Sequence, residues 1–167
     1  MSDSRWTSSE NCRTIKTMPP QSYQLRPIDP GTADAFRALG GVIDVATEQP
    51  GYPCRQCLRD AEVGDELLLV SHDHFTKDTP YRSPTPIFLH REPCTPPEDV
   101  YELPRQLTER QLSVRSFDSD EMMIDATVID GHDLHATIGR FFTAPQSHSI
   151  HVHNATRGCW AVTIQRT

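Results

Sequence analysis

Short runs of alternating hydrophobic and polar residues occupy most of this chain, and this period of two is typical of half-buried β-strands. After an opening strand near Tyr23, the pattern predicts strands at 42–46, 52–56, 67–72 and 87–91. A proline-rich stretch between the last two of these, and another directly after them, mark loops.

Helical signals are short and appear at three places. Asp29 is suited to cap a helix that begins at the following proline and ends at Gly40. This helix is expected to turn Leu39 inward. A weaker helix is predicted at 105–110, and an amphipathic one at 131–142, where apolar residues recur at helical spacing.

The predicted fold class is α+β, with a mostly antiparallel sheet and two or three short helices. The length of 167 residues fits one compact domain, which we place at 21–167. Residues 1–20 carry no periodic apolar pattern, so a disordered N-terminal tail is predicted there.

A hairpin is predicted around the turn at 118–120. Leu112 and Val114 precede the turn, and apolar residues at the even positions of 122–128 follow it. We therefore expect all of these even-numbered residues to face the core, and Arg115 to oppose an odd-numbered residue of the second strand on the outer face.

A second hairpin is predicted at the end of the chain, where apolar residues alternate with polar ones. Strict alternation would put Trp160 on the apolar face. It would also place Cys159 opposite His153, with His151 two residues away on the same face. Such a trio suits a transition metal or a Cys/His nucleophile pair, and it also fits histidines that are merely hydrogen-bonded beside a small buried thiol.

The same hairpin suggests a pocket when two further residues are added. Asn154 follows the histidines directly, and Arg55 would supply an anion contact that a net-acidic protein otherwise lacks. The candidate pocket therefore comprises His151, His153, Asn154, Cys159 and Arg55, and would take a small polar or acidic ligand.

A second group of metal-ligating residue types lies upstream. Cys54 and Cys57 form a Cys-x-x-Cys motif, and His90 and Cys94 follow in a His-x-x-x-Cys motif. This is the ligand count and the short spacing of a four-coordinate Cys₃His zinc site. Free thiols beside the core and a redox dithiol are the alternatives.

Composition and charge limit the classes of binding partner and the cellular location that we expect for this protein. The formal net charge is −7, so nucleic acid and anionic membrane surfaces are disfavoured. No apolar run is long enough to cross a bilayer, and the N-terminus lacks a secretory pattern, so we expect a cytoplasmic protein whose five cysteines are thiols or metal ligands. His72 and His74 lie where a strand runs into a loop and are expected to be solvated. An interaction module without chemistry is a further possibility.

Several motifs of the chain resemble one family. They are Gly51-Tyr52-Pro53-Cys54-Arg55, the stretch 58–69, the Pro-Ile-Phe-Leu-His ending at His90, Phe117-Asp118 with Met122-Met123, and Ile150-His151-Val152-His153-Asn154-Ala155 with Gly158-Cys159. Together they are similar to the domain of unknown function family 1203. The resemblance implies a compact cytoplasmic bacterial domain without an assigned activity.

Overall fold

The computed structural model describes residues 23–167, so the predicted tail at 1–20 lies outside the described residues. The fold is α+β, as predicted, with antiparallel strand pairing in both sheets. In chain order the elements are β1 (Tyr23–Arg26), α1 (Pro30–Leu39), β2 (Val42–Val45), β3 (Glu66–His72), β4 (Thr85–His90), α2 (Arg105–Thr108), β5 (Gln111–Phe117), β6 (Met123–Asp130), the 3₁₀ turn η1 (Gly131–Asp133), α3 (Leu134–Phe141), β7 (Ser149–Asn154) and β8 (Trp160–Arg166).

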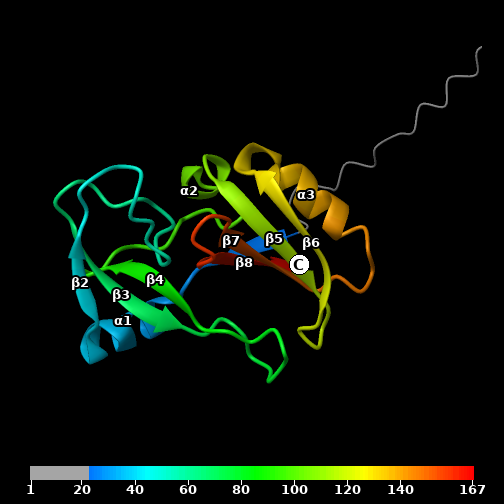
Figure 1. Cartoon of the computed structure of the whole chain (residues 1–167), viewed down its shortest axis with the longest axis horizontal. Helices are drawn as coiled ribbons and strands as arrows, with labels where there is room; N and C mark the ends of the chain where they lie inside the picture. Colours follow the sequence, from blue (N-terminus) through cyan, green and yellow to red (C-terminus); the bar gives the residue numbers. More distant parts are fainter. Residues whose placement is uncertain (1–22) are drawn as a thin grey trace, which may run out of the picture.

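The larger sheet has five strands in the order β1-β8-β7-β5-β6. One of its faces carries the main core, to which β5, β7 and β8 contribute buried aliphatic residues that pack with α2 and α3. Figure 1 shows these two helices above the sheet and the β3–β4 loop below it. The second face carries polar side chains in the middle of the sheet, where Arg115 of β5 pairs with His151 of β7.

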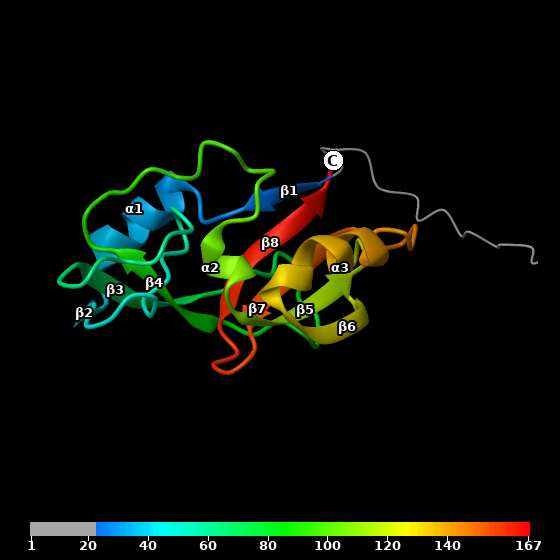
Figure 2. The ribbon, with the colours of Figure 1, turned by 90° about the horizontal axis from the view of Figure 1, so that it is seen from above.

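The smaller sheet has three strands in the order β2-β3-β4. On one face Ala33 of α1 packs with Leu68 and Leu89, and on the other Ala61 packs with Leu67. Helix α1 begins where the sequence predicted, because Asp29 caps it by accepting a hydrogen bond from the amide of Thr32. Figure 2 shows α1 beside this sheet and α3 at the opposite end of the molecule.

Three local predictions are wrong. Leu39, the last residue of α1, is 84% exposed and does not face the core. Residues 52–56 form isolated bridges and a turn rather than a strand. Arg115 pairs with Ala126 and Ser113 with Val128, so the even-numbered residues of β6 share the face of Arg115, opposite the core.

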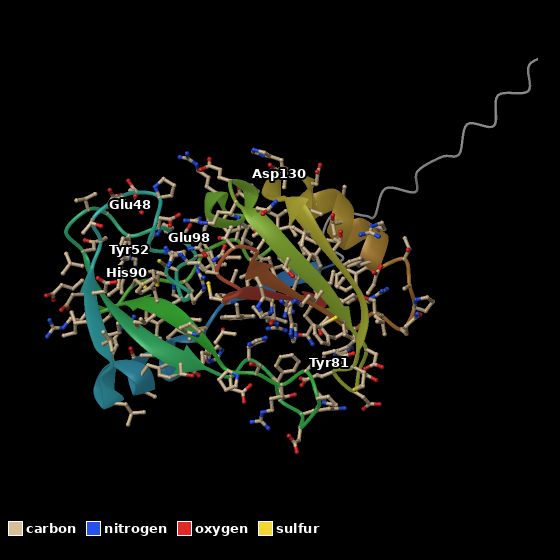
Figure 3. The ribbon with its side chains drawn as sticks, in the orientation of Figure 1. Glu48, Tyr52, Tyr81, His90, Glu98 and Asp130 are labelled. Carbon is tan, nitrogen blue, oxygen red and sulfur yellow. The ribbon has the colours of Figure 1, made fainter. Side chains whose placement is uncertain are left out.

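The β3–β4 loop (73–84) links the two sheets. It runs under the large sheet, where Tyr81 lies near the end of the β5–β6 hairpin (Figure 3) and contacts Phe117. Its backbone is tethered to that hairpin, because Glu121 accepts from the amides of Thr76 and Lys77. Within residues 23–167, no helix combines the length and apolar character needed to cross a membrane.

Candidate functional site

The Cys-x-x-Cys motif forms a tight turn between β2 and β3. The amide of Cys54 donates to Arg59 O, and Leu58 has a left-handed φ of 54°, so the chain reverses directly after Cys57. Cys54 bridges Phe88 of β4. This contact fixes the turn against the strand that ends at the next ligand.

His90 is the last residue of β4, and Cys94 follows it in the loop. Because β4 is held between the turn and β3, the four predicted ligands meet although 33 residues separate Cys57 from His90. The ligand atoms of Cys54, Cys57, His90 and Cys94 all lie within 4.8 Å of one another. Figure 3 labels His90 at the end of the molecule that carries the small sheet.

The distances fit a tetrahedral ion. Cys54 Sγ and Cys94 Sγ are 3.7 Å apart, and Cys57 Sγ is 3.6 Å from His90 Nδ1. Metal–sulfur and metal–nitrogen bonds of about 2.3 and 2.05 Å give tetrahedral edges of about 3.8 Å between sulfurs and about 3.6 Å between sulfur and nitrogen. These two edges therefore match those of a zinc tetrahedron, and the 4.8 Å limit on the other separations keeps all four ligand atoms close to such an ion.

The surroundings orient the ligands. His90 Nε2, the ring nitrogen that does not face the sulfurs, lies 3.6 Å from Asp65 Oδ2. The His90 amide donates to Cys54 Sγ over 3.4 Å. Arg37 of α1 donates to the His90 carbonyl and lies 3.9 Å from Cys94 Sγ. Its positive charge would offset the net negative charge that three thiolates and one divalent ion would carry. Sequence reasoning missed Asp65 and Arg37, because neither belongs to a ligand motif.

The pKa values of three side chains in the cluster are shifted far from their ordinary values. Hydrogen bonds from Cys57 and Cys94 hold the pKa of the Cys54 thiol far below its ordinary value. Hydrogen bonds with Cys54 and Cys57 raise the pKa of His90 to about 10. The Cys94 pKa is raised, chiefly by its hydrogen bond with Cys54. Without an ion, these shifts favour a Cys54 thiolate beside a protonated His90, and a bound metal ion would take the place of the protons on His90 and Cys94.

A surface hollow adjoins the cluster. It has a volume of about 410 Å³, and its lining includes Asp65, His90, Glu92 and Cys94. Cys54 and Cys57 are buried on the protein side, whereas His90 and Cys94 are partly exposed. A metal ion therefore has a route from solvent to the cluster.

The predicted register of the terminal hairpin is wrong. A register shift between Val152 and His153 pairs His153 with Trp160, leaving Ala161 as an extra residue in β8. Trp160 consequently lies on the face of the histidines, where its indole nitrogen donates to Thr163, the partner of His151. Because of this extra residue, the side chain of Trp160 points to the opposite face of the sheet from the one that strict alternation predicts.

The five residues of the predicted hairpin pocket therefore form two groups. Cys159 Sγ lies 3.4 Å from Asn154 Nδ2 and 3.4 Å from Arg55 Nη2. Because Asn154 follows His153 in β7, strand alternation directs the two side chains to opposite faces. Cys159, Asn154 and Arg55 thus lie together, apart from His151 and His153.

Arg55 is 1% exposed and organises the junction of the two sheets. It donates to the backbone carbonyls of Trp160 and Pro53, at 2.6 and 2.9 Å, and to the Gln106 side chain of α2. Burial lowers the pKa of Arg55, and Cys159 is the first of the neighbours that oppose this effect. Because Arg55 lies between Cys54 and Cys57, the fold of the cysteine turn decides where this guanidinium points.

Comparison with known proteins identifies one family. The model of the family described as "Protein of unknown function (DUF1203)" matches residues 51–166, a span that includes both the cysteine turn and the terminal hairpin. No curated protein and no solved structure matches the chain.

Proposed function

We propose that this protein, which belongs to the DUF1203 family of proteins of unknown function, binds Zn²⁺ through Cys54, Cys57, His90 and Cys94. The observation that carries the proposal is the fit of the 3.7 Å and 3.6 Å ligand separations to the edges of a zinc tetrahedron. Three sulfurs and one imidazole nitrogen form a donor set that favours Zn²⁺ over Mg²⁺, Ca²⁺ or Mn²⁺, which prefer oxygen.

The role of this zinc is structural. Four protein ligands fill the coordination sphere, whereas a catalytic zinc keeps one position for water or substrate. The ion would join the cysteine turn to β4 and to the loop that follows it. Since Arg55 projects from that turn into the junction of the sheets, zinc also fixes the contacts of Arg55 with the terminal hairpin.

The ligand chemistry also supports a cytoplasmic location, which we propose on this ground. Thiolate ligands persist where thiols are kept reduced, and paired cysteines this close would be oxidised to disulfides in an oxidising compartment. Four of the five cysteines are described, and all four are free thiols.

Metal analysis of the purified full-length chain tests the zinc proposal. Protein expressed with zinc in the medium and purified without a histidine tag should contain close to one zinc per chain. Cys57→Ser should lose this zinc, and Cys159→Ser should keep it, because Cys159 lies outside the cluster. Zinc-free wild-type protein, or zinc retained by Cys57→Ser, would refute the proposal.

A second measurement covers the case in which Cys57→Ser does not fold. Metal-free wild-type protein should bind Co²⁺ with an intense thiolate-to-cobalt charge-transfer absorption and with the d–d bands of a tetrahedral ion. Cys94→Ser, a change at a partly exposed ligand, should weaken this absorption. An octahedral spectrum without charge transfer would contradict the assignment.

A further inference from the structure

A group of imidazoles lies on the second face of the large sheet, away from the cysteine cluster. His151 and His153 project from β7, and His74 reaches them from the β3–β4 loop. The ring centre of His74 is 5.0 Å from that of His151 and 5.2 Å from that of His153. Residues from two distant parts of the chain thus bring three imidazoles into contact. The expectation that His74 is solvated is wrong, because both of its ring nitrogens are buried against the large sheet.

Three ring nitrogens of this group are buried without a hydrogen-bond partner. His151 is 2% exposed, and its Nδ1 has no hydrogen-bond partner. Both ring nitrogens of His74 are also buried without a partner. A buried polar atom without a partner loses about 1–3 kcal/mol of hydrogen bonding, so such atoms mark places where an ion or water belongs.

His153 is held in the form that binds metals. Its Nδ1 lies 3.0 Å from the carbonyl oxygen of Gly158. Because a carbonyl only accepts hydrogen bonds, Nδ1 carries the hydrogen and Nε2 keeps its lone pair. A backbone carbonyl in this position is a common partner of metal-ligating histidines.

All three imidazoles are neutral at neutral pH. Burial lowers the pKa of His74 to about 2 and those of His151 and His153 to about 4. The positive charge of Arg115, the neighbour of His151 across the strands, contributes in the same direction. Neutral imidazole is the form that coordinates a transition metal.

We propose that His74, His151 and His153 form a second metal site that takes a divalent transition-metal ion such as Zn²⁺, Ni²⁺ or Co²⁺. Three imidazoles suit these borderline ions and leave a coordination position open for water or another ligand. The observed ring spacing is close to the distance of about 5.2 Å between the ring centres of two imidazoles that share one tetrahedral ion.

The two sites differ in how close together their ligand atoms lie. In the part of the chain that the structure describes, the cysteine cluster is the group whose ligand atoms lie within 4.8 Å of one another. The histidine site therefore closes on the ion by rotation of the His74 and His151 rings about χ2, a soft torsion, while His153 stays held by the Gly158 carbonyl. We expect it to bind its ion more weakly than the cysteine cluster and to exchange it readily.

The loop that carries His74 lies directly against this site. Phe75 packs against His151 and Phe117, and covers the imidazoles from below the sheet. The loop is tethered through Glu121, whose carboxylate binds two of its amides at the exposed end of a hairpin. Release of this tether would open the site without disturbing the core, which lies on the other face of the sheet.

Titration of the zinc-loaded full-length protein with Zn²⁺ tests the second site. Wild-type protein should bind a second equivalent, more weakly than the first, by calorimetry. His74→Ala and His151→Ala should each weaken this second equivalent at least tenfold and leave the zinc of the cysteine cluster in place. His132→Ala, at an exposed histidine, is the matched control and should bind as wild type does.

Co²⁺ identifies the ligands of the second ion. Added to zinc-loaded protein, it should give d–d bands without thiolate charge transfer, because only nitrogen and oxygen donors remain. The proposal is overturned if wild-type protein takes no second equivalent, if His74→Ala and His151→Ala bind it unchanged, or if charge transfer appears. None of these outcomes bears on the first equivalent, which Cys57→Ser tests separately. His74 lies in a loop, so its replacement keeps the test valid if His151→Ala fails to fold.

Discussion

His90 Nε2 lies 3.6 Å from the carboxylate of Asp65, while Nδ1 of the same ring faces Cys57. This pair gives a first prediction about zinc affinity. Asp65→Asn should weaken zinc binding about tenfold while keeping one zinc per chain, because a carboxylate behind a ligating histidine raises its basicity and orients its ring. A competition titration with a zinc chelator measures the effect.

Asparagine is the most informative replacement for Asp65, because it removes the charge and keeps the shape of the side chain. Asp65 Oδ2 also accepts from the Glu62 amide, and asparagine retains an acceptor for this turn. Glu66→Gln is the matched control, since it removes the neighbouring carboxylate, whose partner is Arg91 at the surface. Equal zinc affinities in Asp65→Asn and the wild-type protein would show that the carboxylate does not act on the metal.

A second prediction concerns removal of the metal. A strong chelator should lower the thermal midpoint of wild-type protein, because an ion that binds only the folded state stabilises it by about 4 kcal/mol when free zinc exceeds its dissociation constant a thousandfold. The chelator should leave the midpoint of Cys57→Ser unchanged, since that variant has no zinc to lose. Cys159→Ser should respond to the chelator as the wild-type protein does. A wild-type midpoint that ignores the chelator would contradict a stabilising zinc.

The cysteine cluster was predictable from sequence because its ligands come in two short local motifs. The strand pairing that closes the cluster was not, because residues 52–56 look like a strand but form a turn that bridges β4 at one residue. Asp65 and Arg37 approach from a turn and a helix whose packing no local pattern encodes.

The hairpin pocket was predicted from strict alternation, and a single extra residue in β8 defeats that premise. The even-numbered apolar residues of β6 misled in a similar way. β6 is an edge strand, and its residue Val128 is 59% exposed. The apolar character of Val128 therefore does not indicate which face of β6 packs against the core. Both errors concern side-chain facing, and the elements themselves lie close to where the periodicity placed them.

A third prediction tests the packing between α2 and η1. A Cβ at Gly131 would lie 2.7 Å from the carbonyl oxygen of Arg110 and 2.8 Å from the carbonyl carbon of Thr108, which are backbone atoms that cannot turn aside. Gly131→Ala should therefore destabilise the protein by about 3 kcal/mol or more, measured by urea unfolding. Gly31→Ala, in the first turn of α1, is the control and should change stability by less than about 1 kcal/mol. Similar stabilities of the two variants would refute the tight contact.

A fourth prediction concerns pH and the cap of α1. Hydrogen bonds from Thr32 lower the pKa of Asp29 below its ordinary 3.8. A depressed carboxyl pKa contributes stability that is present above pH 3.8 and is lost as the pH falls through the folded-state value. Asp29→Ala should cost about 1 kcal/mol at pH 7. Its difference from wild type, followed by urea unfolding, should shrink below pH 3.8, and a difference that grows on acidification would contradict the cap.

The last prediction concerns the buried pair of Arg55 and Cys159. Replacement of Arg55 by Met fills a similar volume but leaves the carbonyls of Trp160 and Pro53 without their donor. Each buried carbonyl without a donor costs about 1–3 kcal/mol, so the loss of both donors should lower the free energy of unfolding by about 2–6 kcal/mol. Arg55→Lys should also lose stability, because a single ammonium cannot span acceptors that the guanidinium reaches with three nitrogens.

A double-mutant cycle separates the sulfur contact from the rest. Cys159 is the first of the neighbours that raise the Arg55 pKa against its burial, so the sulfur interacts favourably with the buried guanidinium charge. If the pair interacts directly, the effects of Arg55→Met and Cys159→Ala should be coupled by about 1 kcal/mol or more, whereas independent sites add within about 0.5 kcal/mol. Asn154→Ala, which removes the other donor to Cys159, should leave most of this coupling intact. Additive effects of the first two changes would mean that Arg55 is held by its oxygen acceptors, the two carbonyls and Gln106, and that the sulfur only fills space.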